Sequence, residues 1–440
     1  MSTHASPSRR RRLYATAFAA LALLLICSSQ LSARLSAQPR GGALVHFDGD
    51  DAPVGWDGRP LDHAQAAHSI AATFLARSYA AGDRATLSLA QDSARESVQV
   101  FHAGYGSEGP MRGAPVSAPV ALTNGVSRVG VRMGNWPTGL YYARITARGR
   151  TGYAPFVLRP RRLGTQRVAV VLPTNTWQAY NFRDDNGDGV PDTWYANPRV
   201  KCVGLARPFL GDGVPPHYNE DRGFQRWLAV TGKQVDVLSD DDLDRIGSGD
   251  RLAQMYDLVV FPNHEEYVTV REYDAVARYR DLGGNLAFLS ANNLFRRVDR
   301  HGNQLCLVGR FRDLGRPEAG IIGVQYVDWN HDLYRNRPFT VVGAQRARWL
   351  FRGSGLHNGS RFGVYGIEID ARTPQSPPGT QVLAKITDAF GPGESAEMTY
   401  YTTPRGAKVF AAGVINFGSS ALWPITSRLL DNLWNRMARP

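Results

Sequence analysis

Cysteine is scarce in this chain. Only three cysteines occur among its 440 residues, and no two of them are closely spaced. Because the ten histidines are scattered as well, a metal site built from nitrogen and sulfur ligands is not expected. The later two cysteines, Cys202 and Cys306, either form one disulfide or remain two buried thiols, and the sequence leaves both interpretations open.

The chain also lacks the common hydrolase motifs. It contains no Gly-x-Ser-x-Gly, and no cysteine follows a predicted strand in the position of a nucleophile. His264-Glu265-Glu266 is not the zinc-protease motif His-Glu-x-x-His, because Val268 stands where the second histidine belongs. Carboxylates and phenols remain as ligands. Such oxygens suit hard cations, and a phenolate suits a ferric ion in particular.

Acidic residues are absent from the first 37 positions, and this absence accounts for part of the net charge of +12. Without the five arginines of that segment, 46 basic residues face 39 acidic ones, a net charge of +7. The remaining Lys and Arg are spread out rather than gathered in stripes with aromatic residues. A nucleic-acid partner is therefore not expected.

The same N-terminal segment has the three parts of a secretory signal. Four arginines precede an apolar run from Leu13 to Cys27, and small residues continue to Ala33 and Ala37. The run is short for a membrane span of about 20 residues. We predict that residues 1–37 direct export, which makes the protein secreted, periplasmic or attached to the cell surface. The alternative is an uncleaved signal that anchors the chain in the membrane.

The fold class predicted is multidomain α+β, with an N-terminal β-sandwich followed by an α/β domain whose sheet is mostly parallel. In residues 43–160, short β-branched or alternating runs are separated by Gly, Pro and Asn. From residue 165 to 440, strands alternate with helices, and Thr269 with Glu272 forms a capping box for one of them. The strands expected are 97–101, 127–132, 140–145, 153–157, 167–172, 234–238, 256–261 and 285–289, with an acidic connection at 240–244, a hairpin of 398–401 with 408–414, and helices at 222–231, 269–282 and 427–437.

Three polar segments follow predicted parallel strands. They are Thr174–Tyr180, Asn263–Tyr267 and Ser290–Asn293. Loops after the carboxyl ends of parallel strands meet at one edge of a sheet, where ligands bind. The three segments together therefore predict a functional site, and we interpret the first of them as an active-site loop.

A separate acidic stretch, Asp184-Asp-Asn-Gly-Asp-Gly-Val-Pro-Asp192, resembles the first part of a calcium loop. Position twelve is Tyr195 rather than a bidentate glutamate, so it is not an EF-hand. The alternative is a turn whose side chains bond to their own backbone. The calcium ligands predicted are Asp184, Asn186, Asp188 and Asp192.

Four strings resemble one known family, the large subunit of N,N-dimethylformamidase. The strings are LPTNTWQAYN at 172–181, NHEEYVT at 263–269, GGNLAFLSAN at 283–292 and EMTYY at 397–401. The similarity covers about residues 165 to 425, and residues 139–160 are similar to the domain that precedes it in that family. The family hydrolyses a formamide C–N bond with a mononuclear ferric ion held by two tyrosines and a glutamate.

The resemblance implies which residues form the site. It implies Tyr180, Tyr218 and Glu266 as iron ligands, with His264, Asn292 and Glu397 handling water and amide. From the residues alone, other roles stay open: Tyr180 as a packed ring, Glu266 as a cap of the following helix, and Asn292 as a turn former.

The function predicted is an exported, iron-dependent hydrolase of linear amide C–N bonds with a small amide substrate. The alternative is a non-catalytic surface or carbohydrate-contact module with a structural calcium loop. Membrane contact is expected only if the N-terminal segment is retained, and a homo-oligomer is left open. One departure from the family is the export signal, because the family's enzyme is cytoplasmic and has a small partner subunit.

Overall fold

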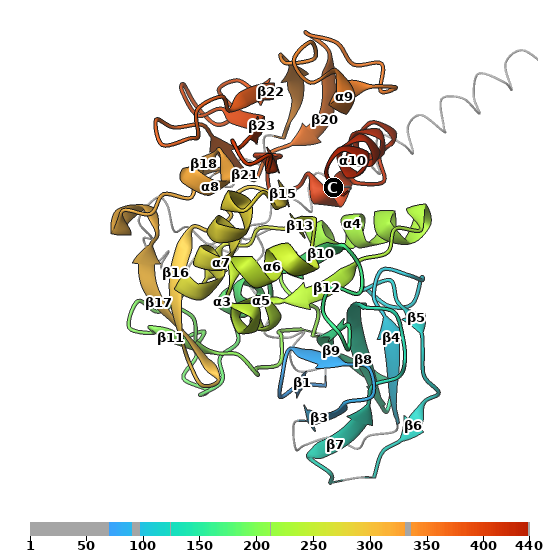
Figure 1. The fold of residues 1–440 in the computed structure, drawn as a ribbon. Helices are drawn as coiled ribbons and strands as arrows, with labels where there is room; N and C mark the ends of the chain where they lie inside the picture. Colours follow the sequence, from blue (N-terminus) through green and yellow to red (C-terminus); the bar gives the residue numbers. More distant parts are fainter. Residues whose placement is uncertain (1–69, 90–96, 124, 212, 331–335, 439–440) are drawn as a thin grey trace, which may run out of the picture. The chain divides into compact units, whose positions relative to one another are not determined.

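A computed structural model describes residues 70–438, apart from residues 90–96, 124, 212 and 331–335. Several sheets and interspersed helices make this a mixed α/β protein (Figure 1). The predicted signal segment, residues 1–37, lies outside the described residues. Within the described part of the chain, no helix has both the length and the apolar composition that a membrane span requires.

The centre of the fold is a nine-stranded sheet, of which the first five strands in spatial order are parallel. Alternate residues of β10 (Val168–Leu172) enter hydrophobic clusters on opposite faces, with Val170 on one face and Val171 on the other. Burial on both faces explains why these strands are continuous apolar runs. The parallel strands are β12 (Asp236–Ser239), β10, β13 (Leu258–Phe261), β15 (Asn285–Phe288) and β24 (Lys408–Ala411).

Helices cover both faces of this parallel half (Figure 1). Thr269 Oγ1 accepts a 3.2 Å hydrogen bond from Glu272 N, and Glu272 Oε2 accepts one from Thr269 N, so the predicted capping box is confirmed. The helices on one face are α4 (Tyr218–Thr231) and α10 (Pro424–Met437), and those on the other are α5 (Asp240–Ile246), α6 (Gly249–Met255) and α7 (Val270–Asp281).

Two segments expected to be irregular are helical. Residues 240–244, predicted as a connection, belong to α5, because Ser239 Oγ accepts from Asp242 N and three aspartates in the first turn favour the helix dipole. The segment Thr174–Tyr180, predicted as a loop, begins with α3 (Thr174–Ala179), whose residues are all buried.

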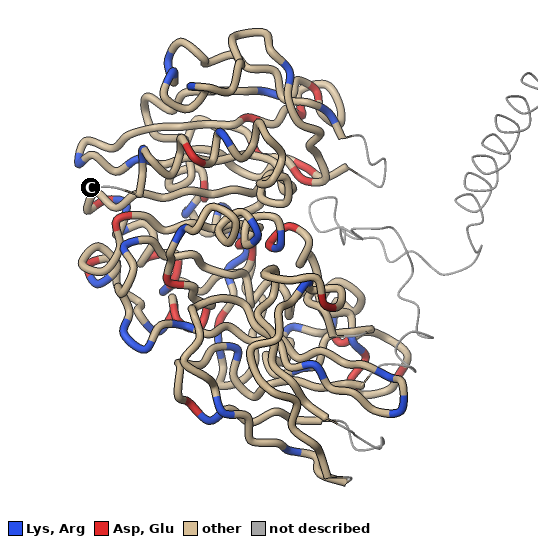
Figure 2. The backbone as a smooth tube through the Cα atoms, turned by 90° about the vertical axis from the view of Figure 1, so that its right-hand side faces the viewer, with Lys and Arg blue, Asp and Glu red and all other residues tan. Residues whose placement is uncertain are grey.

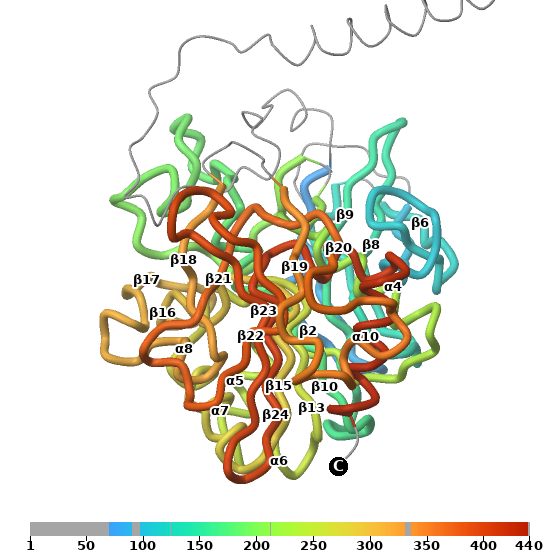
Figure 3. The backbone as a smooth tube through the Cα atoms, turned by 90° about the horizontal axis from the view of Figure 1, so that it is seen from above, coloured from blue at the N-terminus to red at the C-terminus, as the bar shows by residue number. Residues whose placement is uncertain are grey.

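Antiparallel strands extend the central sheet beyond β24, and Figure 3 shows them running beside the parallel ones. The predicted hairpin is confirmed, since β23 (Ala396–Thr402) pairs antiparallel with β24. Beyond β23 the central sheet continues with β22 (Gln381–Ile386), β19 (Arg337–Val341) and β20 (Arg361–Tyr365). A separate two-stranded sheet pairs β18 (Gln325–Trp329) with β21 (Glu368–Ala371). The short helices of this region are α8 (Ala319–Ile322), α9 (Arg348–Phe351), 312–314 and 418–420.

A four-stranded sheet contains the disulfide. Cys202 and Cys306 face each other on neighbouring antiparallel strands and are bonded, which settles the question that the sequence left open. The strands are β11 (Cys202–Gly204), β17 (Gln304–Arg310), β16 (Arg296–His301) and β14 (Tyr267–Val268), in that order.

Two further sheets precede the central one, and the four predicted strands of this region are confirmed. Leu87 and Val131 of the smaller sheet share a hydrophobic cluster with Val100, Tyr141 and Ile145 of the larger sheet. The smaller sheet comprises β1 (Ala72–Phe74), β3 (Arg84–Leu89) and β7 (Arg128–Arg132), and the larger comprises β2 (Ser78–Ala80), β9 (Arg150–Arg159), β8 (Gly139–Ala147), β4 (Ser97–His102) and β5 (Ala114–Pro115), with β6 (Val120–Ala121) beside β4.

The described residues, 70–438, all belong to one compact unit by their contacts. The N-terminal sheets are joined to the central sheet by hydrogen bonds such as that from Thr138 Oγ1 to Val235 O, at 2.7 Å. Lys and Arg residues are interspersed with Asp and Glu along the described chain (Figure 2). The division between residues 160 and 165 stays a prediction.

Candidate functional site

Three segments that follow parallel strands meet at one edge of the central sheet. They are α3 after β10, residues 262–266 after β13, and residues 289–293 after β15. Thr176 Oγ1 accepts a 3.2 Å hydrogen bond from Glu266 N, which joins the first two segments. Asn293 Oδ1 accepts a 2.9 Å bond from Glu265 N, which joins the last two. The polar segments singled out from the sequence therefore do come together.

Tyr180 and Glu266 are in direct contact at the centre of these segments. Tyr180 Oη donates a 2.8 Å hydrogen bond to Glu266 Oε2, and both residues are buried. The rings of Tyr195, His217 and His264 surround the tyrosine, with centroids 4.7, 5.0 and 5.5 Å from its own. The phenol oxygen therefore contacts the carboxyl group of Glu266, and aromatic rings surround the phenol ring.

Two histidines beside Tyr180 leave ring nitrogens unpaired. His264 Nε2 lies 3.5 Å from Glu266 Oε2. Within the described residues, that nitrogen and both ring nitrogens of His217 have no hydrogen-bond partner. Burial lowers the pKa of His264 to about 3, and burial with the neighbouring His264 lowers the pKa of His217 well below its ordinary value. Both imidazoles are thus neutral at pH 7 and have lone pairs available.

Asn292 and Glu368 complete the polar lining. Hydrogen bonding from the Asn292 side chain partly offsets the rise in the pKa of both Glu266 and Glu368. Its backbone N donates a 2.9 Å bond to Asp370 Oδ1. Among the described residues, Asn292 Oδ1 and Glu368 Oε2 lack hydrogen-bond partners. The site therefore offers further oxygen atoms that no other protein group occupies.

The acidic groups of the cluster retain their protons. Burial raises the pKa of Glu266 to about 8. Burial and the nearby Glu266 raise the pKa of both Tyr180 and Glu368 well above their ordinary values. A cation placed among these groups would favour their charged forms.

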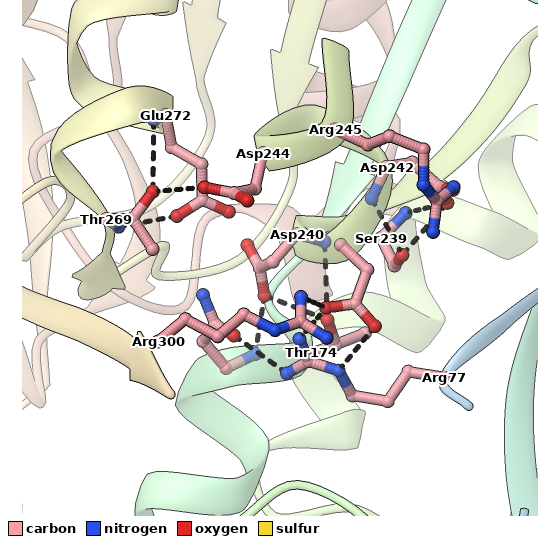
Figure 4. A network of polar contacts seen from close by, with 12 residues as sticks. Arg77, Thr174, Ser239, Asp240, Asp242, Asp244, Arg245, Thr269, Glu272 and Arg300 are labelled. Atoms are coloured by element: carbon pink, nitrogen blue, oxygen red, sulfur yellow. Dashed lines mark hydrogen bonds and ion pairs between the residues drawn. The ribbon is translucent and has the colours of Figure 1, made fainter. Parts of the chain in front are cut away.

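Behind the site, Arg77 connects the N-terminal sheets to α3 and α5 (Figure 4). Its Nη1 donates a 2.7 Å bond to Asn175 Oδ1, and its Nε donates a 3.1 Å bond to Asp241 Oδ2. Asn175 Nδ2 in turn donates a 3.0 Å bond to Tyr267 O, next to Glu266. This chain of bonds fixes both the helix that precedes Tyr180 and the segment that carries Glu266.

Helix α3 is also bonded to Asp240, whose carboxyl group lies near that of the buried Glu265. Asp240 Oδ2 accepts a 2.9 Å bond from Thr174 Oγ1 (Figure 4). Burial and the charge of Asp240 raise the pKa of Glu265 well above its ordinary value. Among the described residues, neither carboxyl oxygen of Glu265 has a hydrogen-bond partner.

The roles expected for Tyr218 and Glu397 stay predictions, because their polar atoms bond to groups other than Tyr180 and Glu266. Tyr218 Oη donates a 2.7 Å bond to Met111 O, in the N-terminal part of the chain. Glu397 Oε2 accepts a 3.0 Å bond from Arg372 Nε, and its Oε1 lies 3.7 Å from Lys385 Nζ. The resemblance transferred roles to these two residues, but their polar atoms are engaged elsewhere.

The predicted calcium loop, residues 184–192, is an exposed turn whose side chains bond to the loop backbone. Asp184 accepts from the N–H groups of Gly187 and Gly189 at 2.7 and 2.8 Å, and these bonds lower its pKa. Three further side chains also accept from the loop backbone: Asn186 Oδ1 from Asp188 N, Asp188 Oδ1 from Val190 N, and Asp192 Oδ2 from Asp185 N. These bonds match the alternative of a turn whose side chains bond to its own backbone. Calcium binding by Asp184, Asn186, Asp188 and Asp192 stays a prediction.

Backbone strain is concentrated around the cluster. His217, Asn292, Leu294 and Ile367 have φ angles of 59°, 52°, 57° and 70°, in the left-handed region that L-residues rarely adopt. Each lies within two residues of, or within, the lining described above. Strain of this kind costs about 1–3 kcal/mol per residue and tends to persist at functional sites.

The donor set suits a hard or borderline cation. A phenol, a carboxylate and neutral imidazoles are the ligand types that iron accepts. Among the described residues, no three His, Cys, Asp or Glu side chains are arranged to hold a metal ion. A site here therefore depends on the phenol of Tyr180, which stands outside that class of ligands, together with Glu266.

Sequence reasoning missed three groups of this site. Thr176 was included in a polar segment but given no role, His217 was passed over beside Tyr218, and Glu368 lay in a region interpreted only as short β-runs. A signal was present for the last one: Glu368-Ile-Asp370 puts two carboxylates on the same side of a strand, an unusual pattern for a buried strand.

Comparison with known proteins gives one informative match. Residues 128–422 match the family described as N,N-dimethylformamidase beta subunit-like, C-terminal. A search among curated proteins finds no match. The superoxide reductase (neelaredoxin) of Ignicoccus hospitalis is 12% identical over 28% of this chain and 100% of its own, with a TM-score of 0.18. A cycloisomaltooligosaccharide glucanotransferase of Paenibacillus sp. is 11% identical over 54% of this chain and 34% of its own, with a TM-score of 0.16, and neither likeness carries an argument.

Proposed function

Because the chain belongs to the N,N-dimethylformamidase beta subunit-like family, we propose that it is a hydrolase of linear amide C–N bonds with a mononuclear iron site. The observation that carries the proposal is the buried 2.8 Å contact between Tyr180 Oη and Glu266 Oε2, surrounded by unpaired polar atoms. Such a group of buried, unpaired atoms is costly unless a ligand or ion satisfies them. Tyr180 and Glu266 are the ligands we propose for iron.

When bound, iron would supply Lewis acidity toward the carbonyl oxygen of the amide. In the overall reaction, water adds to the carbonyl carbon, the C–N bond breaks, and the amine leaves with one proton from that water. His264 Nε2 and Glu368 Oε2 are the unpaired groups beside the ligands, and we propose that they hold and move this proton. Asn292 would orient the amide or the water through its unpaired Oδ1, which accepts a hydrogen bond from an N–H or O–H.

We assign the proton-handling carboxylate to Glu368 rather than to Glu397. Glu397 is paired with Arg372 and Lys385. Glu368 is buried close to Glu266, and burial together with the charge of Glu266 raises the pKa of Glu368. Glu368→Gln should therefore reduce turnover by about 100-fold or more, in the range for loss of a general acid or base. Glu397→Gln should leave turnover within about twofold if its ion pair is only structural.

Other features of the proposal follow from the sequence. The two N-terminal sheets share one hydrophobic cluster, which supports their assignment as a β-sandwich. Export through residues 1–37 remains our proposal for localisation, with a small linear amide as substrate. Retention of that segment would instead anchor the chain.

The test is metal analysis of the purified full chain together with its visible absorption and its hydrolysis of N,N-dimethylformamide. We expect one iron per chain, a tyrosinate-to-iron absorption band, and release of dimethylamine. Tyr180→Phe should abolish the band, whereas Tyr326→Phe, a buried tyrosine of β18, should retain it. A chain that takes up no iron, or takes up calcium alone, contradicts the proposal.

A further inference from the structure

Asn263, the residue before His264, is buried and uses both ends of its side-chain amide in hydrogen bonds. Its Nδ2 donates to His217 O at 3.1 Å and to Asp221 Oδ2 at 3.0 Å. Its Oδ1 accepts from His264 N at 2.7 Å. A backbone carbonyl can only accept and a backbone N–H can only donate, so these partners fix which end of the amide is oxygen.

Asp221 of helix α4 holds the same amide in place. Its side chain is buried, and its Oδ2 also accepts a 3.3 Å bond from Trp177 Nε1 of α3. Because an indole N–H can only donate, Oδ2 is an acceptor toward both of its neighbours. A reversed amide at Asn263 would put its oxygen against the carbonyl of His217 and its N–H groups against the N–H of His264. The observed orientation is therefore the one that all four partners support.

The amide oxygen of Asn263 also faces the ring of His264, since Oδ1 lies 3.4 Å from Nδ1. An amide oxygen has only lone pairs, so it attracts a proton on Nδ1 and repels a lone pair there. A neutral imidazole carries one ring proton, and a proton on Nδ1 leaves Nε2 with a lone pair. Within the described residues Nε2 has no hydrogen-bond partner, and it lies 3.5 Å from Glu266 Oε2.

We propose that Asn263 is a positioning residue that fixes the tautomer of His264, with the proton on Nδ1 and the lone pair on the Nε2 that lies beside Glu266. The use of that lone pair in hydrolysis rests on the proposed function. Nε2 accepts a proton from the attacking water as the water oxygen bonds to the carbonyl carbon, and the proton leaves with the amine when the C–N bond breaks. The opposite tautomer presents an N–H at this position and cannot accept that proton.

Nuclear magnetic resonance of the full chain with ¹⁵N-labelled histidine reads the tautomer, because protonated and unprotonated ring nitrogens have well-separated ¹⁵N shifts. Gallium(III), a diamagnetic ion with the charge of Fe³⁺, replaces iron for this measurement. The His264 signals are those that disappear in His264→Gln. We expect the shift of an unprotonated nitrogen at Nε2 and of a protonated one at Nδ1. The reverse pattern in the unaltered protein overturns the proposal without recourse to any further variant.

Two substitutions of Asn263 separate its acceptor from its packing. Asn263→Leu has a similar size but no acceptor, so the proton of His264 should move toward Nε2. Asn263→Asp keeps an acceptor and should keep the proton on Nδ1. With iron bound, Asn263→Leu should lower kcat at least about 100-fold and leave KM within about threefold, while Asn263→Asp retains more of kcat. An unchanged tautomer in Asn263→Leu overturns the role of Asn263, as does an equal loss of kcat in the two variants.

Asn432→Leu is the matched control. Asn432 is a buried asparagine of α10 whose Nδ2 donates to Leu350 O and Arg352 O at 2.7 and 2.8 Å. Its replacement removes two bonds to backbone carbonyls, but none of them involves the segment that carries His264. The control should keep both the tautomer and the kcat of the unaltered protein, and a change of tautomer there would mean that Asn263 has no specific effect.

The tautomer and the hydrolase proposal fail separately. If the chain binds iron and hydrolyses N,N-dimethylformamide while His264 carries its proton on Nε2, the assigned tautomer is wrong and the proposed function is unaffected. If the chain takes up no iron, the hydrolase proposal fails. The spectrum of the full chain without added metal then decides the tautomer alone: a proton on Nδ1 that moves in Asn263→Leu supports the role of Asn263, and a proton on Nε2 overturns it.

Discussion

Tyr180 Oη and Glu266 Oε2 share a 2.8 Å hydrogen bond although 86 residues separate them in the chain. Each residue ends a segment that follows a different parallel strand, so the bond spans two neighbouring strands of the central sheet. Burial favours the protonated form of both groups, because it raises the pKa of Glu266 to about 8 and the pKa of Tyr180 well above its ordinary value. The contact thus joins the fold of the sheet edge to the chemistry proposed for it.

Thr176→Val should weaken iron binding without removing a ligand. The hydroxyl accepts hydrogen bonds from Glu266 N at 3.2 Å and Tyr267 N at 3.4 Å, and valine has the same shape but no acceptor. Loss of such support typically lowers metal affinity by about 10–100-fold. Competition with a chelator measures the change. Thr146→Val is the matched control, because it removes a bond to Ser97 between β4 and β8 of the N-terminal sheets. An equal affinity in both variants would refute a supporting role for Thr176.

Arg77→Met should lower both stability and turnover. The guanidinium bonds to Asn175 and Asp241, and Arg300 remains as a second partner of that aspartate. We expect a loss of about 1–3 kcal/mol in the free energy of unfolding, measured by urea denaturation. Arg167→Met removes an ion pair from a side chain that is 51% exposed and should cost less than about 1 kcal/mol. Equal losses in the two variants would show that burial of Arg77 has no particular effect.

Replacing both Cys202 and Cys306 by serine should destabilise the chain by about 2–5 kcal/mol, because the bond closes a long loop of the unfolded state. Cys202 and Cys306 are 104 residues apart, which puts the effect toward the upper part of that range. Denaturation with and without a reductant provides the measurement. The reductant should destabilise the unaltered protein and leave the double variant unchanged; a protein insensitive to reductant contradicts the structural role.

His102→Phe should flatten the pH dependence of stability in acid. His102 is stacked between Tyr105 and Tyr141, with ring centroids 3.7 and 4.3 Å away, and burial lowers its pKa to about 3. The unfolded chain binds a proton near pH 6.5, so the contribution of His102 is complete above that value. It is lost as pH falls toward 3, at about 1.4 kcal/mol per pH unit.

The measurement for His102 is the free energy of unfolding from pH 8 to pH 4, with each variant referred to its own value at pH 8. His301→Phe, at an exposed end of β16, is the control and should keep the slope of the unaltered protein. If His102→Phe also keeps that slope, protonation of the buried imidazole does not limit acid stability.

Local patterns were sufficient to predict much of the fold. The apolar run of β10 and the capping box of α7 depend on neighbouring residues, and both are present as expected. The helical state of Thr174–Ala179 was not predictable in this way. Its hydroxyl and amide groups are satisfied by Arg77 and Asp240, which lie far from it in the chain. Tertiary contacts therefore overrode a sequence typical of a loop.

The site was predicted in part for the same reason. Position after a strand sufficed to bring Tyr180, Glu266 and Asn292 to one edge. Position after a strand gave no information on side chains whose direction depends on a single φ angle. At His217 the φ angle is positive, and its ring contacts Tyr180 while the hydroxyl of the next residue, Tyr218, bonds to Met111 O. Glu368 arrives from a separate two-stranded sheet, which no local pattern connects to the central one.

The bond between Arg77 and Asn175 has a consequence for any attempt to isolate the fragment that carries the candidate site. A fragment that begins at residue 166 would retain Asp240, Asp241, Glu265 and Glu272, which are all buried, but would lose the guanidinium that lies among the first two. Arg300 would remain beside Asp241, but Asn175 and Asp241 would each lose a hydrogen bond from Arg77 next to α3. The smallest unit able to take up metal is thus expected to include the N-terminal sheets, even though they supply no ligand.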